Sequence, residues 1–294
     1  MRDNVSQYVI KPLLAEMESG NLPFWTKPWK TKNGMPFNVL TKKNYHGGNR
    51  FMLMLETMLK GGNDPRWMGM GQANKIGAKV RKGEKGTMVW IPLLVKDKAN
   101  QEEKLIGFKY GHVFHVSQFD NLDQSKIEPI EERVLPNNPI TACEEWINRL
   151  NPKIINGVAA SYSFESDLIC IPKITAFDSS EKYYHILLHE LGHWTGHLDR
   201  CNRERKNSYG SEKYGFEELI AEIFSLFAAY ELGLEIEKEI PDSAAYIKGW
   251  MKSLTENPNW IPKAAEAAEK AMRFCLKGKI EIEESRHEEM EAVA

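Results

Sequence analysis

The 294-residue sequence predicts an α+β protein of two domains. The length is natural for two domains of ordinary size. In the first part of the sequence, strand-like runs are separated by glycine residues, whereas patterns typical of apolar helices dominate the second part. The formal charge divides in the same way, because residues 1–122 hold 19 Lys and Arg against 10 Asp and Glu, and the remainder holds 20 against 31.

The predicted first domain, residues 1–125, opens with a helix. Its stretch 3–19 has apolar residues at helical spacing and ends before Gly20, which is a typical stop signal. The following stretch, 22–50, is rich in proline, glycine, lysine and aromatic residues, so little regular structure is expected there. A short apolar run at 51–59 predicts a second helix.

Strands are expected in the second half of this domain. The stretch 67–95 ends in a β-rich run, and 104–119 forms a second strand region. Turn signals at Lys82-Gly83 and Lys85-Gly86 favour a sheet that is rich in hairpins.

A polar, acidic stretch that contains proline, 126–137, is the predicted linker to the second domain. This second domain, 138–280, is expected to be mainly helical, and an acidic tail follows at 281–294. Its predicted elements are a helix at 139–150 with Pro139 in the first turn, a strand at 162–173, a helix at 178–198 capped by Asp178 or Ser179, a helix at 215–233 closed by Gly233, and helices near 242–255 and 259–277.

Composition argues against several classes of protein. No apolar run approaches the length of a membrane helix, and the start "MRDNVSQYVI" does not resemble a signal peptide. The four cysteines are far apart and form no CxxC pair, so neither a disulfide framework nor a cysteine-based zinc ribbon is expected. We therefore expect a cytoplasmic protein with reduced thiols and no membrane partner.

The stretch "HELGHWTGHLD", residues 189–199, contains the zinc-protease motif HExxH. Residues four apart lie on the same face of a helix, so His189 and His193 can direct their rings at one ion. Glu190 lies one step round the helix, where it can act as a general base without being a ligand. We expect His185 to support the site and His197 to lie at the helix end.

Two acidic residues compete for the third ligand position. Glu218 lies on the next apolar helix, and Glu222 follows one turn later, where it could accept an N–H from a ligating histidine. Glu217 would face a different direction. The rival is Asp199, because "HELGHWTGHLD" also fits the pattern HExxHxxGxxD. We favour Glu218, since Met251 lies in a helical context and does not suggest the methionine turn that accompanies the rival pattern. Zinc is the expected metal, although two histidines and a glutamate also accept manganese or cobalt.

The chain resembles the ArdC-type antirestriction proteins of conjugative plasmids. In the first domain the resemblance rests on "PFWTKPW", "NYHGGNRFML", "QANKIGAKVRKGEKGT" and "VFHVSQ", and in the second on "HELGHWTGHLDR" followed by "YGFEELIAEIFSLFAAYELGL". The resemblance implies a first domain that binds single-stranded DNA and a second with a zincin-like metallopeptidase fold. It also implies that the protein protects incoming plasmid DNA from host restriction.

The basic first domain independently suggests a polyanionic partner, for which nucleic acid is the usual choice. Sequence-independent binding of single strands requires cations for the phosphates and flat side chains on which bases stack. The candidate platforms are Trp25, Trp29, Tyr45 and Trp67, although Trp67, like Trp90, is more typical of a core. The candidate phosphate contacts are Lys27, Lys30, Arg50, Lys79, Arg81, Lys82 and Lys85.

Three hypotheses for function follow. The first is an antirestriction protein that coats single-stranded DNA. The second is a zinc endopeptidase tethered to DNA, which cleaves proteins bound to single strands, such as a component of a restriction system. The third, a zinc-fold regulator or toxin, has only the metal motif in its favour.

Overall fold

The computed structural model describes residues 10–18, 34–59, 64–96, 103–130, 139–203, 212–234 and 251–277. The chain folds into two compact units, built on Asn33–Arg133 and on Val134–Ile280 and called here the N-terminal and C-terminal units. The first described helix, α2 (Lys11–Glu18), is grouped with the C-terminal unit, although its sequence position had suggested the first domain. Among the described residues, no helix has the length and apolarity required to cross a membrane.

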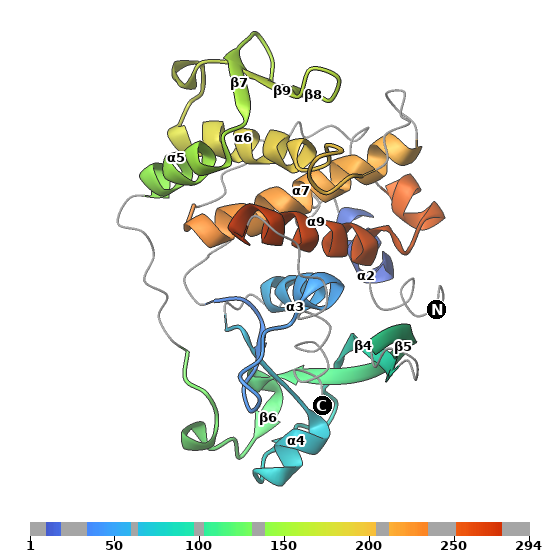
Figure 1. Cartoon of the computed structure of the whole chain (residues 1–294). Helices are drawn as coiled ribbons and strands as arrows, with labels where there is room; N and C mark the ends of the chain where they lie inside the picture. The colour runs from blue at the N-terminus through green and yellow to red at the C-terminus, as the bar shows by residue number, and fades with distance from the viewer. Residues whose placement is uncertain are drawn as a thin grey trace. The chain divides into compact units, whose positions relative to one another are not determined.

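The N-terminal unit is built on a four-stranded sheet in the order β1-β2-β5-β4. Its two long strands, β4 and β5, are labelled in Figure 1. β1 and β2 are parallel, and the other pairs are antiparallel. The two predicted strand regions contain β4 and β5, the two longest strands, which pair as a hairpin, whereas the turn signals at Lys82-Gly83 and Lys85-Gly86 lie before β4 and do not form its turn. The elements are β1 (Phe37–Asn38), α3 (Gly47–Leu59), β2 (Arg66–Gly69), α4 (Met70–Lys75), β3 (Lys79–Val80), β4 (Thr87–Lys96), β5 (Glu103–His115) and β6 (Phe119–Asp120), of which β3 and β6 form a separate two-stranded sheet. The helix α4 was not predicted.

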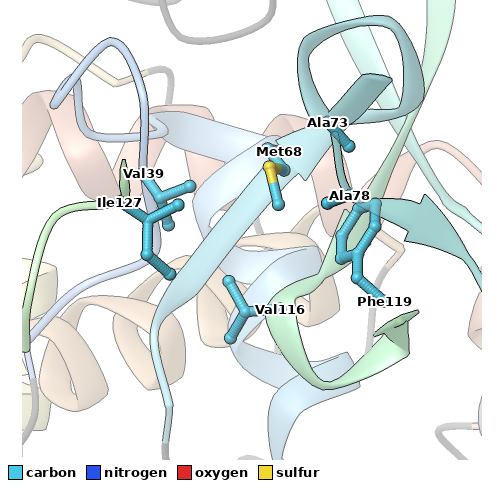
Figure 2. Close-up of a cluster of buried hydrophobic side chains, with 7 residues drawn as sticks. All are labelled: Val39, Met68, Ala73, Ala78, Val116, Phe119 and Ile127. Carbon is cyan, nitrogen blue, oxygen red and sulfur yellow. The ribbon is translucent and has the colours of Figure 1, made fainter. Parts of the chain in front are cut away.

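Strand β2 contributes to two separate apolar clusters of this unit. Consecutive residues of a strand point to opposite faces of the sheet, so Trp67 and Met68 lie on different sides. Trp67 packs with Tyr45, Leu53, Val89 and Val113. Met68 belongs to the second cluster, drawn in Figure 2, which consists of Val39, Met68, Ala73, Ala78, Val116, Phe119 and Ile127.

The beginning of the predicted linker is part of the N-terminal unit. Ile127 is buried beside Val39 in the second cluster (Figure 2). The backbone N–H of Glu128 donates to the carbonyl oxygen of Val39 at 3.1 Å, and its carboxylate pairs with Lys42 at 2.6 Å. These contacts place Ile127 and Glu128, which the prediction assigned to the linker, in the N-terminal unit.

The C-terminal unit combines a small sheet with long helices (Figure 1). The sheet has the order β7-β9-β8, in which β7 and β9 are parallel and β8 is antiparallel to β9. The strand predicted at 162–173 is a hairpin, and β7 was not predicted. The elements are α5 (Pro139–Leu150), β7 (Lys153–Asn156), β8 (Ser161–Ser163), β9 (Leu168–Ile171), α6 (Ser180–Trp194), α7 (Glu212–Leu232) and α9 (Trp260–Lys277), and residues 251–256 are also helical.

Helices α6 and α7 approach each other closely at Gly192. A Cβ atom at this position would lie 2.8 Å from the Cα of Ala221 and 3.1 Å from its Cβ. Because Ala221 presents backbone at this point, the helices could accommodate a larger residue only by moving apart. The absence of a side chain at Gly192 therefore sets the separation of the two helices.

The substitution Gly192→Ala is expected to destabilise the C-terminal unit by about 1–3 kcal/mol, since overpacking a close helix contact forces the backbone to shift. Chemical denaturation monitored by circular dichroism measures this loss. Gly71→Ala is the matched control, because no atom lies within 4 Å of a Cβ at that position. Equal stability of the two variants would contradict the close contact.

Candidate metal centre and nucleic-acid surface

The two motif histidines lie on one face of α6, near its C-terminal end. The helix starts after Ser179, whose hydroxyl accepts the backbone N–H of Lys182 at 3.1 Å, so Ser179 rather than Asp178 is the cap. One turn of helix separates His189 from His193. Their Nε2 atoms are 3.2 Å apart, which means that both rings point to the same spot.

Glu218 on α7 completes a group of three donors. Its Oε2 lies 3.4 Å from Nε2 of His189, and its Oε1 lies 3.4 Å from Nε2 of His193. One ligand atom from each of the three residues falls within 4.8 Å of the others. Two imidazole nitrogens and a carboxylate are a donor set that suits a divalent transition metal, so the residues present fit such an ion.

The rival ligand, Asp199, is outside this group. Its side chain is 86% exposed and lies 3.4 Å from Nδ1 of His197. Asp199 contributes no atom to the donor group found among the described residues, so the sequence pattern HExxHxxGxxD does not correspond to a ligand set here. The geometry favours Glu218.

A second carboxylate lies behind each of the two histidines. Glu222 places its Oε1 3.7 Å from Nδ1 of His189, in the position that the sequence suggested for it. Glu217 places its Oε1 3.5 Å from Nδ1 of His193. Carboxylates in this position orient the ring and set the tautomer in which Nε2 is the metal donor.

Glu217 was not predicted to contribute, because its neighbour Glu218 points into the site. The side chains of Glu217 and Glu218 leave α7 in different directions, yet both contact the ring of His193, Glu217 at Nδ1 and Glu218 at Nε2. A run of two adjacent acids on a helix facing HExxH is the only signal in the sequence that could have identified it.

The carboxylates strongly affect the protonation of the centre. Burial opposes the charged form of His193, but its hydrogen bonds to Glu217 and Glu218 outweigh burial and raise the pKa of His193 to about 9. Burial likewise opposes ionisation of Glu217, whereas His193 and Arg203 lower its pKa to about 2. The pKa of Glu218 is also held far below its usual range by the two histidines, against the effect of burial.

The affinity of the protein for Zn²⁺ should therefore rise with pH. Below about pH 9 the ring of His193 carries a proton in the metal-free protein, and the ion must displace it. We expect the apparent association constant to increase about tenfold for each pH unit up to that value. Competition titrations with a chromophoric chelator between pH 6 and 9 measure this slope, and a flat profile would contradict it.

Glu190 has the environment that a general base requires. Its side chain is buried, with 8% exposed, and desolvation raises the pKa of its carboxyl group above the usual value, even though the nearby histidines act in the opposite direction. The backbone N–H of Tyr162 in β8 donates a hydrogen bond to it. The carboxyl group is thus held beside the donors without being one of them.

The two other histidines of the motif region take no part in the donor group. His185 is buried one turn before His189, with 2% exposed. His197 lies beyond the end of α6, where its ring contacts Phe164 with a centroid distance of 4.9 Å. His197 therefore lies at the helix end, as the sequence suggested, whereas a supporting role of His185 stays a prediction.

The predicted DNA contacts in the N-terminal unit fall into three groups. Trp25, Lys27, Trp29 and Lys30 lie outside the described residues. Four cations, Lys79, Arg81, Lys82 and Lys85, are exposed on one short segment, residues 79–85, which we call the basic loop. The remaining two predicted residues, Tyr45 and Arg50, have contacts within the fold.

The prediction that Tyr45 is a stacking platform is wrong. Its side chain is 0% exposed and packs against Trp67, which is also fully buried. Arg50 is partly buried and donates through Nε to the carbonyl oxygen of Tyr45 at 3.0 Å and through its terminal nitrogen to Nδ1 of His46 at 3.2 Å. In the same stretch, the side chain of Asn49 bonds both the N–H and the carbonyl oxygen of Trp90 at 2.8 Å. The stretch "NYHGGNR" therefore supports the fold.

Hydrogen bonds from Gln118, the last residue of the stretch "VFHVSQ", stabilise the basic loop. Its side-chain amide donates to Glu84 at 2.9 Å and to the backbone carbonyl oxygen of Lys85 at 3.0 Å, and its backbone carbonyl oxygen accepts the backbone N–H of Arg81 at 2.9 Å. Arg81 is also held by Glu84 at 3.0 Å and by the carbonyl oxygen of Ser117. The loop thus has a defined backbone that presents three exposed lysines, Lys79, Lys82 and Lys85.

Comparison with known proteins assigns both parts of the chain. Residues 3–117 match the N-terminal domain of the antirestriction factor ArdC, and residues 141–267 match a zincin-like metallopeptidase domain. The predicted fold class, an α+β domain followed by a zincin-like domain, is therefore confirmed. The zincin-like fold also indicates a divalent metal.

Solved structures of similar sequence cover nearly the whole chain. Two crystal structures of the antirestriction ArdC protein from plasmid R388 align over 92% of this chain and 96% of theirs. The metal-free structure gives a TM-score of 0.69 at 33% identity, and the Mn(II)-bound structure gives 0.71 at 32% identity.

Two DNA primases TraC from Escherichia coli are 35% and 33% identical over 92% of this chain. The chain spans only 20% and 27% of the length of these relatives. The protein y4eC of Sinorhizobium fredii is 29% identical over 90% of this chain and 89% of its own length.

Proposed function

Because the chain belongs to the ArdC family of antirestriction proteins, we propose that it binds single-stranded DNA in the cytoplasm and thereby protects incoming plasmid DNA from host restriction. One observation carries the DNA-binding part of this proposal. The unit that matches the ArdC N-terminal domain presents Lys79, Lys82 and Lys85 as exposed cations on a braced loop.

The physical basis is the release of counterions. Each phosphate that a lysine neutralises releases condensed cations, so binding depends on the charge of the loop and on the salt concentration. A loop with a defined backbone loses little conformational freedom on binding. These properties suit a protein that coats a strand whatever its sequence.

Two measurements test this function. An electrophoretic shift with labelled oligonucleotides should show tighter binding to single-stranded than to double-stranded DNA of the same sequence. Transfer of an unmodified conjugative plasmid into a restricting host should be more efficient when the protein is present. Equal transfer with and without the protein would reject the antirestriction function for this chain.

A second candidate function is a zinc-dependent endopeptidase that cleaves proteins on single-stranded DNA, such as components of a restriction system. It is favoured by the group of His189, His193 and Glu218 beside the buried carboxyl group of Glu190. A divalent ion held by these three donors would lower the pKa of a bound water molecule and polarise a peptide carbonyl group. Glu190, whose pKa is raised by burial, would accept the proton of that water at neutral pH.

The substitution Glu190→Gln separates the two candidates. We expect peptide cleavage to fall by about 10²- to 10⁴-fold, which is the usual contribution of a general base, while affinity for Zn²⁺ and for oligonucleotides stays unchanged. Cleavage is followed by mass spectrometry of a peptide library. The control is Glu165→Gln, which removes an exposed carboxylate of the same unit. If plasmid protection survives Glu190→Gln, proteolysis is not its mechanism.

We propose zinc as the native ion of this centre, with manganese and cobalt as ions that the same donors accept. Metal analysis of the protein purified without added ions tests this choice. A stoichiometric content of manganese in place of zinc would overturn it.

A further inference from the structure

We propose that Arg203 is a positioning residue for the metal centre: it holds Glu217 behind His193 and thereby fixes the orientation of that histidine. The inference rests on the proposed metal site. Arg203 lies beyond the HExxH motif, in the polar stretch that follows α6, and no sequence pattern distinguishes it from neighbouring arginines.

The guanidinium group of Arg203 donates two hydrogen bonds to the carboxylate of Glu217. Nε donates to Oε2 at 3.0 Å, and a terminal nitrogen donates to Oε1 at 2.6 Å. The side chains of both residues are only 12% exposed. A bidentate pair of this kind restricts the plane of the carboxylate as well as its position, and its burial excludes the water that would otherwise compete.

The same carboxylate oxygen meets the metal-binding histidine. Oε1 of Glu217, which accepts from Arg203, lies 3.5 Å from Nδ1 of His193. A proton on Nδ1 that is directed at this oxygen leaves Nε2 with its lone pair facing Glu218 and His189. Arg203 thus reaches His193 through one intermediate residue.

The remaining donors of Arg203 bind the end of the helix that carries His193. One terminal nitrogen donates to Oγ1 of Thr195 at 2.8 Å, and the other donates to the carbonyl oxygen of Gly192 at 2.7 Å. A cation is favourable at a helix C-terminus, where carbonyl groups lack partners. Arg203 therefore connects α6 to Glu217 on α7, the two helices that supply the three donors.

Gly196, the second glycine of "HELGHWTG", leaves the space that Arg203 occupies. A Cβ atom there would lie 2.9 Å from a terminal nitrogen of Arg203 and 3.0 Å from the carbonyl oxygen of His193. The backbone N–H of Arg203 also donates to the carbonyl oxygen of Gly196 at 3.0 Å. The chain after α6 thus returns to the end of this helix, and the guanidinium group of Arg203 occupies the space that the missing side chain of Gly196 leaves.

A second arginine of the same stretch is a matched control. Arg200 is also buried, with 9% of its side chain exposed, and pairs with Asp167. Its guanidinium carbon lies 3.9 Å from the ring centroid of Trp194, and its Nε donates to the carbonyl oxygen of Trp194 at 2.6 Å. None of these partners is a donor of the metal centre, so Arg200 supports stability without contacting Glu217.

The test compares Arg203→Gln, Glu217→Gln, the double variant and Arg200→Gln. Zn²⁺ affinity is measured by chelator competition, and the visible spectrum of the Co²⁺-loaded protein reports the geometry of the donors. We expect Arg203→Gln to weaken Zn²⁺ binding about 10- to 100-fold, as the loss of an outer partner of a ligand does, and to change the Co²⁺ spectrum. The double variant should bind no more weakly than Glu217→Gln alone, because Arg203 acts through Glu217.

Three outcomes would overturn the inference. The first is that folded Arg203→Gln binds Zn²⁺ as tightly as the wild type. The second is that Arg203→Gln and Arg200→Gln lose the same Zn²⁺ affinity, because such a loss would reflect stability alone. The third is that the losses of affinity in Arg203→Gln and Glu217→Gln add up in the double variant. If Arg203→Gln does not fold, Arg203→Lys replaces it in every comparison, since it keeps the charge and loses the bidentate geometry. Failure of the wild-type protein to bind Zn²⁺ would instead overturn the metal site itself, and the inference with it.

Discussion

Alanine in place of His193 is expected to weaken Zn²⁺ binding about 100- to 1000-fold. Binding free energies of about 10–16 kcal/mol for four-ligand zinc sites correspond to about 2.5–4 kcal/mol for each donor, and each 1.4 kcal/mol is a factor of ten. His193 is one of the three donors that the described part of the chain brings together, so its loss leaves two of them. Chelator competition at pH 8 measures the change.

The same measurement on three other variants decides which residues are ligands. Glu218→Ala should resemble His193→Ala, because both carboxylate oxygens of Glu218 face the histidine nitrogens. His197→Ala and Asp199→Ala are controls at the end of the same helix and should bind Zn²⁺ like the wild type. Strong loss in Asp199→Ala together with a small loss in Glu218→Ala would contradict the geometry and restore the rival ligand.

Reversal of the three lysines of the basic loop should greatly weaken binding to single-stranded DNA. In the variant Lys79→Glu, Lys82→Glu, Lys85→Glu, three cations that could each neutralise a phosphate become repulsive. We expect the affinity to fall by at least about 100-fold at 0.1 M salt. The plot of the logarithm of the association constant against the logarithm of the salt concentration should become less steep by about 0.7 for each phosphate contact removed. Arg81 is kept, because its contacts with Glu84 and Ser117 maintain the loop.

Fluorescence anisotropy with a labelled oligonucleotide at several salt concentrations measures both quantities. The control variant reverses Lys153, Lys173 and Lys252, three exposed lysines of the C-terminal unit, and therefore has the same net charge. If both variants lose affinity equally, the total charge of the protein matters and the basic loop is not a specific contact. Because Gln118 is retained in the charge-reversal variant, we expect the backbone of the basic loop to be unchanged by the three substitutions. Circular dichroism checks that the variant is folded like the wild type.

Local patterns in the sequence predicted much of the C-terminal unit correctly. The boundaries of α5 and the C-terminal end of α7 follow from apolar spacing, Pro139 and Gly233, and Ser179 was one of the two caps expected for α6, whereas α7 starts at Glu212, three residues before the predicted start. His189 and His193 share a face because a helix repeats every 3.6 residues, whatever surrounds it. The preference for Glu218 over Asp199 also came from the sequence, since an acid on a strongly apolar helix requires a partner.

The N-terminal unit was more difficult to predict from its sequence. Tyr45 lies among glycines and polar residues, which are typical of an exposed loop, yet its ring is in the core. Asn49 looks like a solvated side chain, although it bonds the backbone of Trp90, 41 residues away. Such contacts depend on which distant strand passes near a residue, and no local pattern carries this information.

Spacing along the chain was enough to predict that His189 and His193 share a face with Glu190 beside them, and that the first half is basic, because helical repeat and charge are properties of short segments. Folding alone settled that Glu217 reaches Nδ1 of His193, that Arg203 secures it, and that Asp199 stays in solvent. These placements depend on how closely α6 and α7 approach at Gly192, and on the path of the chain after α6. Both result from packing between segments that are remote in sequence.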